Sequence, residues 1–181
     1  MSRPPKAREA LLSAYRDLVA LEGERAATLE AVAARAGVSK GGLLYHFGSK
    51  EALLKGLLEA FRADFALDRE LMAADPEGPS RYFVRTSLYT GTELDRLFVA
   101  VLRLAQGGSV PAREALAATE RGWHELVRAE VGDTATATAI MLMGEGLYQY
   151  SSYSGARPEA DFGTSLDEVL AVVDRLTGRR S

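Results

Sequence analysis

The chain has 181 residues, of which 47% are apolar and 26% are charged. This is the composition of an ordinary globular protein with one domain or two small ones. A formal net charge of −3 argues against a chain that binds nucleic acid over its whole surface. The chain has no cysteine, which excludes disulfides, cysteine zinc sites, thiol catalysis and iron–sulfur clusters.

The charge is distributed unevenly along the chain. Residues 1–50 carry eight Lys and Arg but only five Asp and Glu, whereas the remaining residues are acidic overall. This asymmetry favours an N-terminal part that meets a polyanion on its own, although so mild an excess can also arise by chance. The N-terminus lacks an apolar signal segment, and no apolar run approaches the roughly 18 residues of a membrane helix. We therefore expect a soluble, cytoplasmic protein that does not enter a membrane.

Apolar residues recur at steps of three and four from the start of the chain, which predicts helices. The first helix places four apolar residues on one face: Leu11, Ala14, Leu18 and Leu21. Thr28, Ser39 and Ser49 are the predicted N-caps of the next three helices. Gly37 and Gly48 are the predicted stops of the second and third. Three short helices therefore form the N-terminal part.

The fourth predicted helix is long. Its apolar face consists of Leu53, Leu54, Leu57, Leu58, Phe61 and Phe65. Breakers at 75–79 and 107–111, and a predicted loop over 154–164, divide the rest into further helices, including one from Ser80 to about Tyr89. We expect an all-α fold of about nine helices, in which a three-helix head (1–48) is joined by the long fourth helix to a helical body within 49–181.

Residues 28–47 have the pattern of a helix, a tight turn and a second helix. Ala33 is small where the two helices approach, Gly37 suits the turn, and Leu43 can seal the pair against the first helix. The outer face of the second helix consists of Lys40, Gly41, Gly42, Leu44, Tyr45 and His46. A short helix with such a face suits the major groove of DNA, although a helical hairpin in an ordinary bundle has a similar pattern.

The stretch 28–54 resembles the N-terminal signature of the TetR/AcrR family of transcriptional regulators. The segments 33–41 (AARAGVSKG), 45–47 (YHF) and 49–51 (SKE) stand at the spacing of that family. The resemblance extends over about residues 5–65, a third of the chain. It implies a homodimer with two heads that bind a double-stranded DNA operator and a body that senses a small molecule.

Carried over position by position, the resemblance implies DNA contacts at Thr28, Ser39, Lys40, Gly42, Leu44, Tyr45, His46 and Lys50. Thr28 and Lys50 would meet phosphate. Gly42 stands where the family often has Thr, Ser or Ala, and Leu44 where it often has Tyr. Glycine offers no side chain and leucine could touch only a thymine methyl. Tyr45 and His46 are therefore the stronger candidates for base contacts.

The resemblance also implies that the last two helices, about 133–153 and 165–178, form the dimer interface. The candidate interface residues are Ile140, Met143, Leu147, Leu166, Val169, Leu170 and Val173. Gly144 and Gly146 would allow close approach of helices there, or would simply weaken their own helix by about 1 kcal/mol each.

The body is rich in aromatic residues, a minority of which could line an apolar cavity for an effector. The candidates are Phe65, Phe98, Leu102, Trp123 and Tyr148. The body shows no evident carboxylate or arginine at an apolar position, which favours a neutral, hydrophobic effector.

The alternatives to a regulator have weaker support in the sequence. His46 and His124 are the only histidines, and their spacing does not suggest a metal site. No catalytic constellation or cofactor motif stands out, so we expect neither an enzyme nor a bound cofactor. An architectural DNA-binding protein without a ligand is the other alternative, but the body is larger than a clamp requires. The sequence therefore favours a repressor that a small molecule releases from its operator.

Overall fold

The computed structural model describes residues 4–155 and 158–179, and these residues form ten helices and no strand. The helices are α1 (Pro4–Glu22), α2 (Leu29–Ala36), α3 (Lys40–His46), α4 (Lys50–Ala74), α5 (Gly78–Thr86), α6 (Glu93–Gln106), α7 (Val110–Val131), α8 (Thr134–Ser154), α9 (Pro158–Phe162) and α10 (Leu166–Thr177). The all-α prediction is confirmed. The first three residues of the predicted head, and residues 156–157 of the predicted loop, lie outside the described residues.

The helices differ from the prediction in two places. The segment predicted as a loop over 154–164 contains the five-residue helix α9, so the described residues hold ten helices rather than nine. Pro158 opens α9, and proline is favoured in a first turn because its missing N–H would have no helical partner there. Helix α5 ends at Thr86, three residues earlier than expected.

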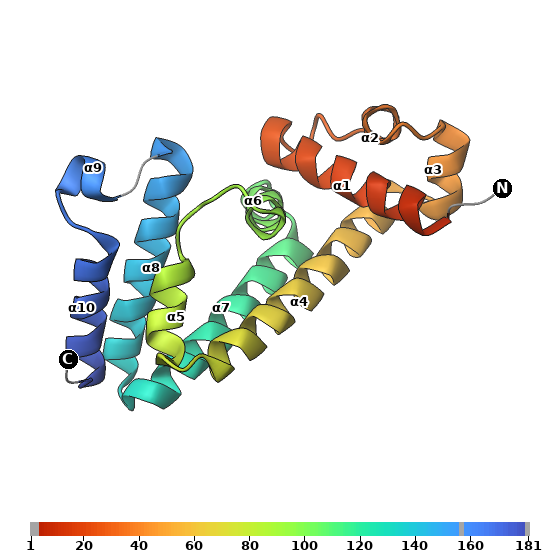
Figure 1. The fold of residues 1–181 in the computed structure, drawn as a ribbon. Coiled ribbons are helices and arrows are strands. Elements are labelled where there is room, and N and C mark those ends of the chain that lie inside the picture. Colours follow the sequence, from red (N-terminus) through yellow and green to blue (C-terminus); the bar gives the residue numbers. More distant parts are fainter. Residues whose placement is uncertain (1–3, 156–157, 180–181) are drawn as a thin grey trace. The chain divides into compact units, whose positions relative to one another are not determined.

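The chain divides into two compact units. The first contains the residues up to Asp64 together with Gly91–Ala117, and in it α1 packs against α2, α3 and α6. Figure 1 shows α1 to α3 packed on one another as a three-helix group. The core of this unit includes Leu11, Tyr15, Val19, Val32, Leu43, Leu53, Leu57 and Phe61. Leu21, the last residue of the stripe predicted on α1, is instead 65% exposed.

The predicted caps of the N-terminal helices are confirmed. The hydroxyl oxygens of Thr28, Ser39 and Ser49 each accept a hydrogen bond from the backbone N–H three residues on, at 3.1 Å. Gly37 ends α2 in the left-handed conformation, with φ of 66°. Gly48, however, is not in the left-handed region, and α3 ends at His46, where the following Phe47 has an extended backbone. The turns around the second and third helices are thus set by local sequence.

The second unit consists of Phe65–Thr90 and the described residues from Ala118 onward. Helix α5 packs against both α8 and α10, and the three lie side by side in Figure 1. The core of this unit contains Met72, Phe83, Val84, Val127, Ala137, Ile140, Met141, Leu170 and Val173, which come from α4, α5, α7, α8 and α10. The predicted boundary between head and body, after Gly48, remains a prediction. In the described part of the chain, no helix is long and apolar enough to cross a membrane.

Candidate functional site

Helices α2 and α3 form a compact helix-turn-helix. Val32 and Ala33 of α2 and Leu43 of α3 are buried, and Phe47, directly after α3, is buried as well. An isolated helix of seven residues is not stable in water, so α3 depends on this packing for its shape. The buried side of the motif therefore holds its opposite side in a fixed position.

The opposite side of α3 presents an aromatic and an aliphatic side chain to solvent. Tyr45 is 84% exposed and Leu44 is 44% exposed. Lys40 is also exposed, whereas His46 is half-buried with its ring 5.2 Å from that of Tyr45. An exposed aromatic side chain on a short, rigidly packed helix can reach the edges of bases in a major groove.

Gly42 does not lie wholly on the outer face of α3, where it was predicted. It is half-buried, and a Cβ atom at this position would lie 2.8 Å from Cγ1 of Val38 and 3.3 Å from Oγ of Ser39. The position therefore faces the turn before α3 as well as the outside. Glycine here lets Val38 pack close to the first turn of the helix, which gives a structural reason for the departure from the family pattern.

The cationic groups expected to meet DNA have partners within their own unit. The Lys40 ammonium donates to the Glu30 carboxylate at 2.6 Å. The Lys50 ammonium donates to the backbone carbonyl of Glu24 at 2.6 Å and lies 3.7 Å from its carboxylate. Neither acid was singled out from the sequence, because pairs 10 and 26 residues apart leave no periodic signal. If Lys40 and Lys50 contact DNA as predicted, they have to exchange or extend these contacts.

The five residues predicted to line an effector cavity do not form one group. Phe65 and Trp123 are in contact, with ring centroids 5.2 Å apart. Tyr148 contacts Tyr89 instead, at 5.9 Å. Phe98 and Leu102 are half-buried residues of α6, which belongs to the other compact unit. Neither of the two surface grooves described below is lined by any of the five.

The aromatic group around Trp123 contains a carboxylate that was missed in the sequence. Asp68 accepts one hydrogen bond from the Trp123 indole N–H at 2.8 Å and another from the Tyr82 hydroxyl at 2.9 Å. The pKa of Tyr82 is raised, first by burial and then by the charge of Asp68, so its hydroxyl stays protonated as a donor. The expectation that the body has no carboxylate among apolar residues is therefore wrong. The Phe83 ring, 5.5 Å from that of Trp123, completes the group.

The residues predicted for a dimer interface fall into two classes. Ile140, Leu170 and Val173 are buried in the core of the second unit, so they offer no surface to a second copy. This corrects their assignment as contacts. For Ile140 the reason is that α8 carries a single charged residue, so its sequence does not reveal which face turns inward. The other four, Met143, Leu147, Leu166 and Val169, are half-buried at the edge of that core.

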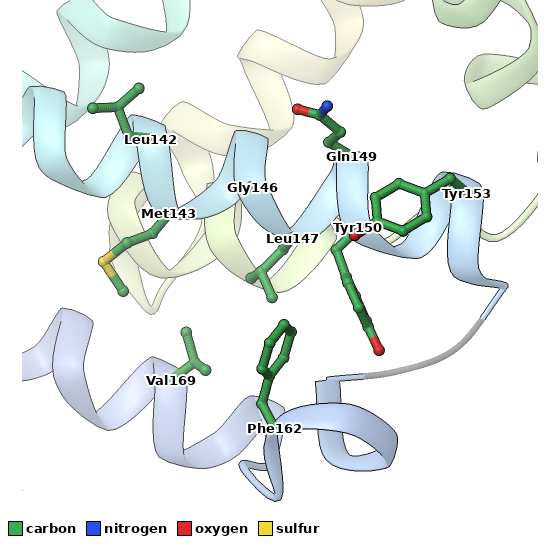
Figure 2. Close-up of a pocket in the computed structure, with 9 residues that line it drawn as sticks. All are labelled: Leu142, Met143, Gly146, Leu147, Gln149, Tyr150, Tyr153, Phe162 and Val169. Atoms are coloured by element: carbon green, nitrogen blue, oxygen red, sulfur yellow. The ribbon is translucent and has the colours of Figure 1, made fainter.

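An open groove of about 510 Å³ runs along α8, α9 and α10. It is lined by Leu142, Met143, Gly146, Leu147, Gln149, Tyr150, Tyr153, Phe162 and Val169, none of which is charged. Figure 2 shows Met143 and Leu147 pointing from α8 toward Val169 and Phe162, whereas Leu142 points away from α10. Leu142 also lines a second groove, between α7 and α8. The exposed apolar side chains Leu142 and Tyr153 were not identified as interface candidates from the sequence.

The part of the chain that the structure describes gives no support for metal binding. In the ranges 4–155 and 158–179, no group of three or more His, Asp or Glu side chains is placed to hold a metal ion. Nε2 of His124 lies 3.2 Å from the Thr138 hydroxyl, and the His46 ring contacts Tyr45. The two histidines thus have ordinary structural contacts.

Comparison with known proteins agrees with this geometry. Residues 11–57 match the family model of bacterial regulatory proteins of the tetR family. A transcriptional regulator from Streptomyces coelicolor A3(2) is 25% identical, with 96% of this chain and 99% of that chain covered and a TM-score of 0.65. A TetR-family regulator from Rhodococcus sp. is 22% identical over 94% and 98%, with a TM-score of 0.70. A comparison with curated proteins gave no match.

The multidrug binding protein EbrR has a similar fold. Its complex with malachite green is 20% identical to this chain, covers 93% of this chain and 96% of that one, and has a TM-score of 0.69. EbrR has also been solved with ethidium. The packed helix-turn-helix with an exposed α3, together with these matches, indicates a DNA-binding transcriptional regulator. The N-terminal part of the chain thus matches the TetR family model, and the described residues share their fold with TetR-family regulators.

Proposed function

We propose that this DNA-binding regulator acts as a homodimeric repressor that a small hydrophobic molecule releases from its operator. The observation that carries the DNA-binding part is the exposed face of α3, where Tyr45 and Leu44 project from a helix fixed by Leu43. In a dimer, two such helices would enter major grooves about one helical turn apart, or a multiple of it, on a near-palindromic site.

The uncharged groove along α8 and α10 supports the homodimer. Leu142 and Tyr153 are apolar side chains at the surface of α8, where they are 61% and 73% exposed. Exposed apolar surface of this kind is stabilised when a second surface excludes water from it. The half-buried interface candidates Met143, Leu147 and Val169 line the same groove.

The aromatic group of the second unit supports an effector site. The Trp123 ring contacts the rings of both Phe65 and Phe83, and the three residues lie on different helices, so a molecule inserted among them would move those helices. EbrR, which has this fold, binds aromatic dyes. An effector releases DNA only if it prefers the conformation that does not bind DNA. A coupling free energy of about 1–3 kcal/mol would change DNA affinity about 5–150-fold.

Selection of bound fragments from a random DNA pool at moderate salt, followed by footprinting, tests the DNA-binding part of this proposal. We expect a palindromic footprint with two half-sites. Binding without enrichment, which disappears as salt rises, would contradict sequence-specific regulation. The selected operator then serves to screen small molecules for release. Trp123 is the only tryptophan, so quenching of its emission reports binding directly. An absence of any effector would favour the architectural alternative.

Tyr45→Ala is expected to relax the preference for particular base pairs of the selected operator. The side chain is almost fully exposed on α3 and can contact a base edge. Loss of one good base contact lowers discrimination at that position by about 1–3 kcal/mol. Affinities for the operator and its single-base variants, measured by fluorescence anisotropy, check this. A uniform loss across all sequences would assign Tyr45 to the DNA backbone instead.

A further inference from the structure

The charged surface beside the helix-turn-helix contains an acid at a position where phosphate would be expected. Glu30 is in the first turn of α2, two residues after the N-cap Thr28. Its carboxylate accepts a hydrogen bond from the Lys40 ammonium at 2.6 Å, and both side chains are largely exposed. The pair thus joins the start of α2 to the start of the recognition helix α3.

The donors around Glu30 are those of an anion-binding site. The first backbone N–H groups of a helix have no helical partner and favour negative charge. The pKa of the Glu30 carboxyl is lowered, first by the Lys40 hydrogen bond and then by the backbone N–H of Glu30 itself. A lysine and a helix N-terminus are also the groups that commonly bind DNA phosphate. One carboxylate of the chain therefore already uses both kinds of donor.

We propose that Glu30 is an internal competitor of DNA phosphate, which holds Lys40 and the first turn of α2 in the unbound protein and so limits DNA affinity. A phosphate arriving at this end of α2 has to displace the carboxylate or share its donors. The inference rests on α3 facing the DNA, as proposed above.

Lys50 provides a contrast within the same unit. Its ammonium donates to the backbone carbonyl of Glu24, and the carboxylate of Glu24 is farther away, at 3.7 Å. A neutral side chain at position 24 leaves that carbonyl in place. Substitution of Glu24 should therefore release Lys50 less completely than substitution of Glu30 releases Lys40.

The test is the affinity of four proteins for duplex DNA: the wild type, Glu30→Gln, Lys40→Ala and the double variant. A fluorescein-labelled duplex of arbitrary fixed sequence, about 30 base pairs long, is sufficient because phosphate contacts do not depend on sequence. Anisotropy titrations are repeated over a series of KCl concentrations. Glu9→Gln is the matched control, because it removes the same charge from an exposed position on α1. Thermal unfolding confirms that each variant is folded.

We expect Glu30→Gln to tighten binding about two- to fivefold, the range expected for freeing one exposed ion pair. It should also steepen the salt dependence by up to about 0.9, since one more phosphate is neutralised. Most of the gain should disappear in the double variant, and Glu9→Gln should have little effect at physiological salt because of screening.

Three results would overturn the inference: no tightening by Glu30→Gln, equal tightening by Glu9→Gln, or a gain that persists fully with Lys40→Ala. The last two would show that only net charge matters. Failure of the DNA-binding part of the proposed function is recognised separately, because the wild type would then not bind duplex DNA at all.

Discussion

Replacement of Leu142 by glutamate is expected to turn the proposed homodimer into a monomer. Leu142 is 61% exposed, projects from α8, and lines the grooves on both sides of that helix. A second copy that covers the uncharged groove along α8 and α10 would remove the new carboxylate from water at its edge, which costs several kcal/mol unless the carboxylate finds a partner. We expect the dimer dissociation constant to rise at least about 100-fold, which corresponds to about 2.7 kcal/mol.

Sedimentation of the variant over a range of concentrations measures this change directly. Operator affinity should fall with it, because a monomer places only one head on a two-part site. Leu71→Glu is the matched control: Leu71 is 63% exposed on α4 but lines neither groove. If Leu142→Glu stays dimeric while the control behaves as wild type, the α8 surface is not the interface. The homodimer would then require a different face.

The local parts of the fold were predictable from the sequence because their causes are local. A serine or threonine that caps a helix, and a glycine that ends one, act within three or four residues. The caps at Thr28, Ser39 and Ser49 and the stop at Gly37 were therefore identified correctly. The short helix α9 was missed because its five residues are too few for an apolar period to appear.

The orientation of α8 could not be predicted, for a physical reason. From Thr134 to Ser154 the only charged residue is Glu145, so polarity does not mark an outer face. Ile140 and Leu142 look equivalent in such a helix, yet the first is fully buried and the second is exposed. Packing against α5 and α10 decides between them, and that packing depends on the tertiary structure.

Dependence on tertiary packing also explains why Asp68 and Glu30 could not be identified from the sequence. Asp68 and Trp123 are 55 residues apart, and Glu30 and Lys40 are 10 apart across a turn. In each case the hydrogen bond exists only after two separate helices have packed together. Sequence analysis identified the lysine and the tryptophan as functional candidates, but it could not identify the carboxylates that hold them. The charges around a binding surface therefore depend on the tertiary structure, even where the ends of its helices are set by neighbouring residues.

Two adjacent leucines of α3 test how the recognition surface is held in place. Leu43 is fully buried, whereas Leu44 is 44% exposed. Leu43→Ala removes most of the apolar packing of a seven-residue helix and should lower the free energy of unfolding of the first unit by about 2–5 kcal/mol. DNA affinity should fall at least tenfold, because a frayed α3 no longer presents Tyr45 in one position.

Leu44→Ala is the control, and it should change stability by less than about 0.5 kcal/mol because the side chain is at the surface. Chemical denaturation followed by far-ultraviolet circular dichroism measures the two stabilities. Trp123 lies in the other compact unit, so its emission should remain native when Leu43→Ala loosens the first unit. Equal destabilisation by both substitutions would mean that α3 is not anchored through Leu43. A fall in DNA affinity with Leu44→Ala alone, at unchanged stability, would instead make Leu44 a direct contact with DNA.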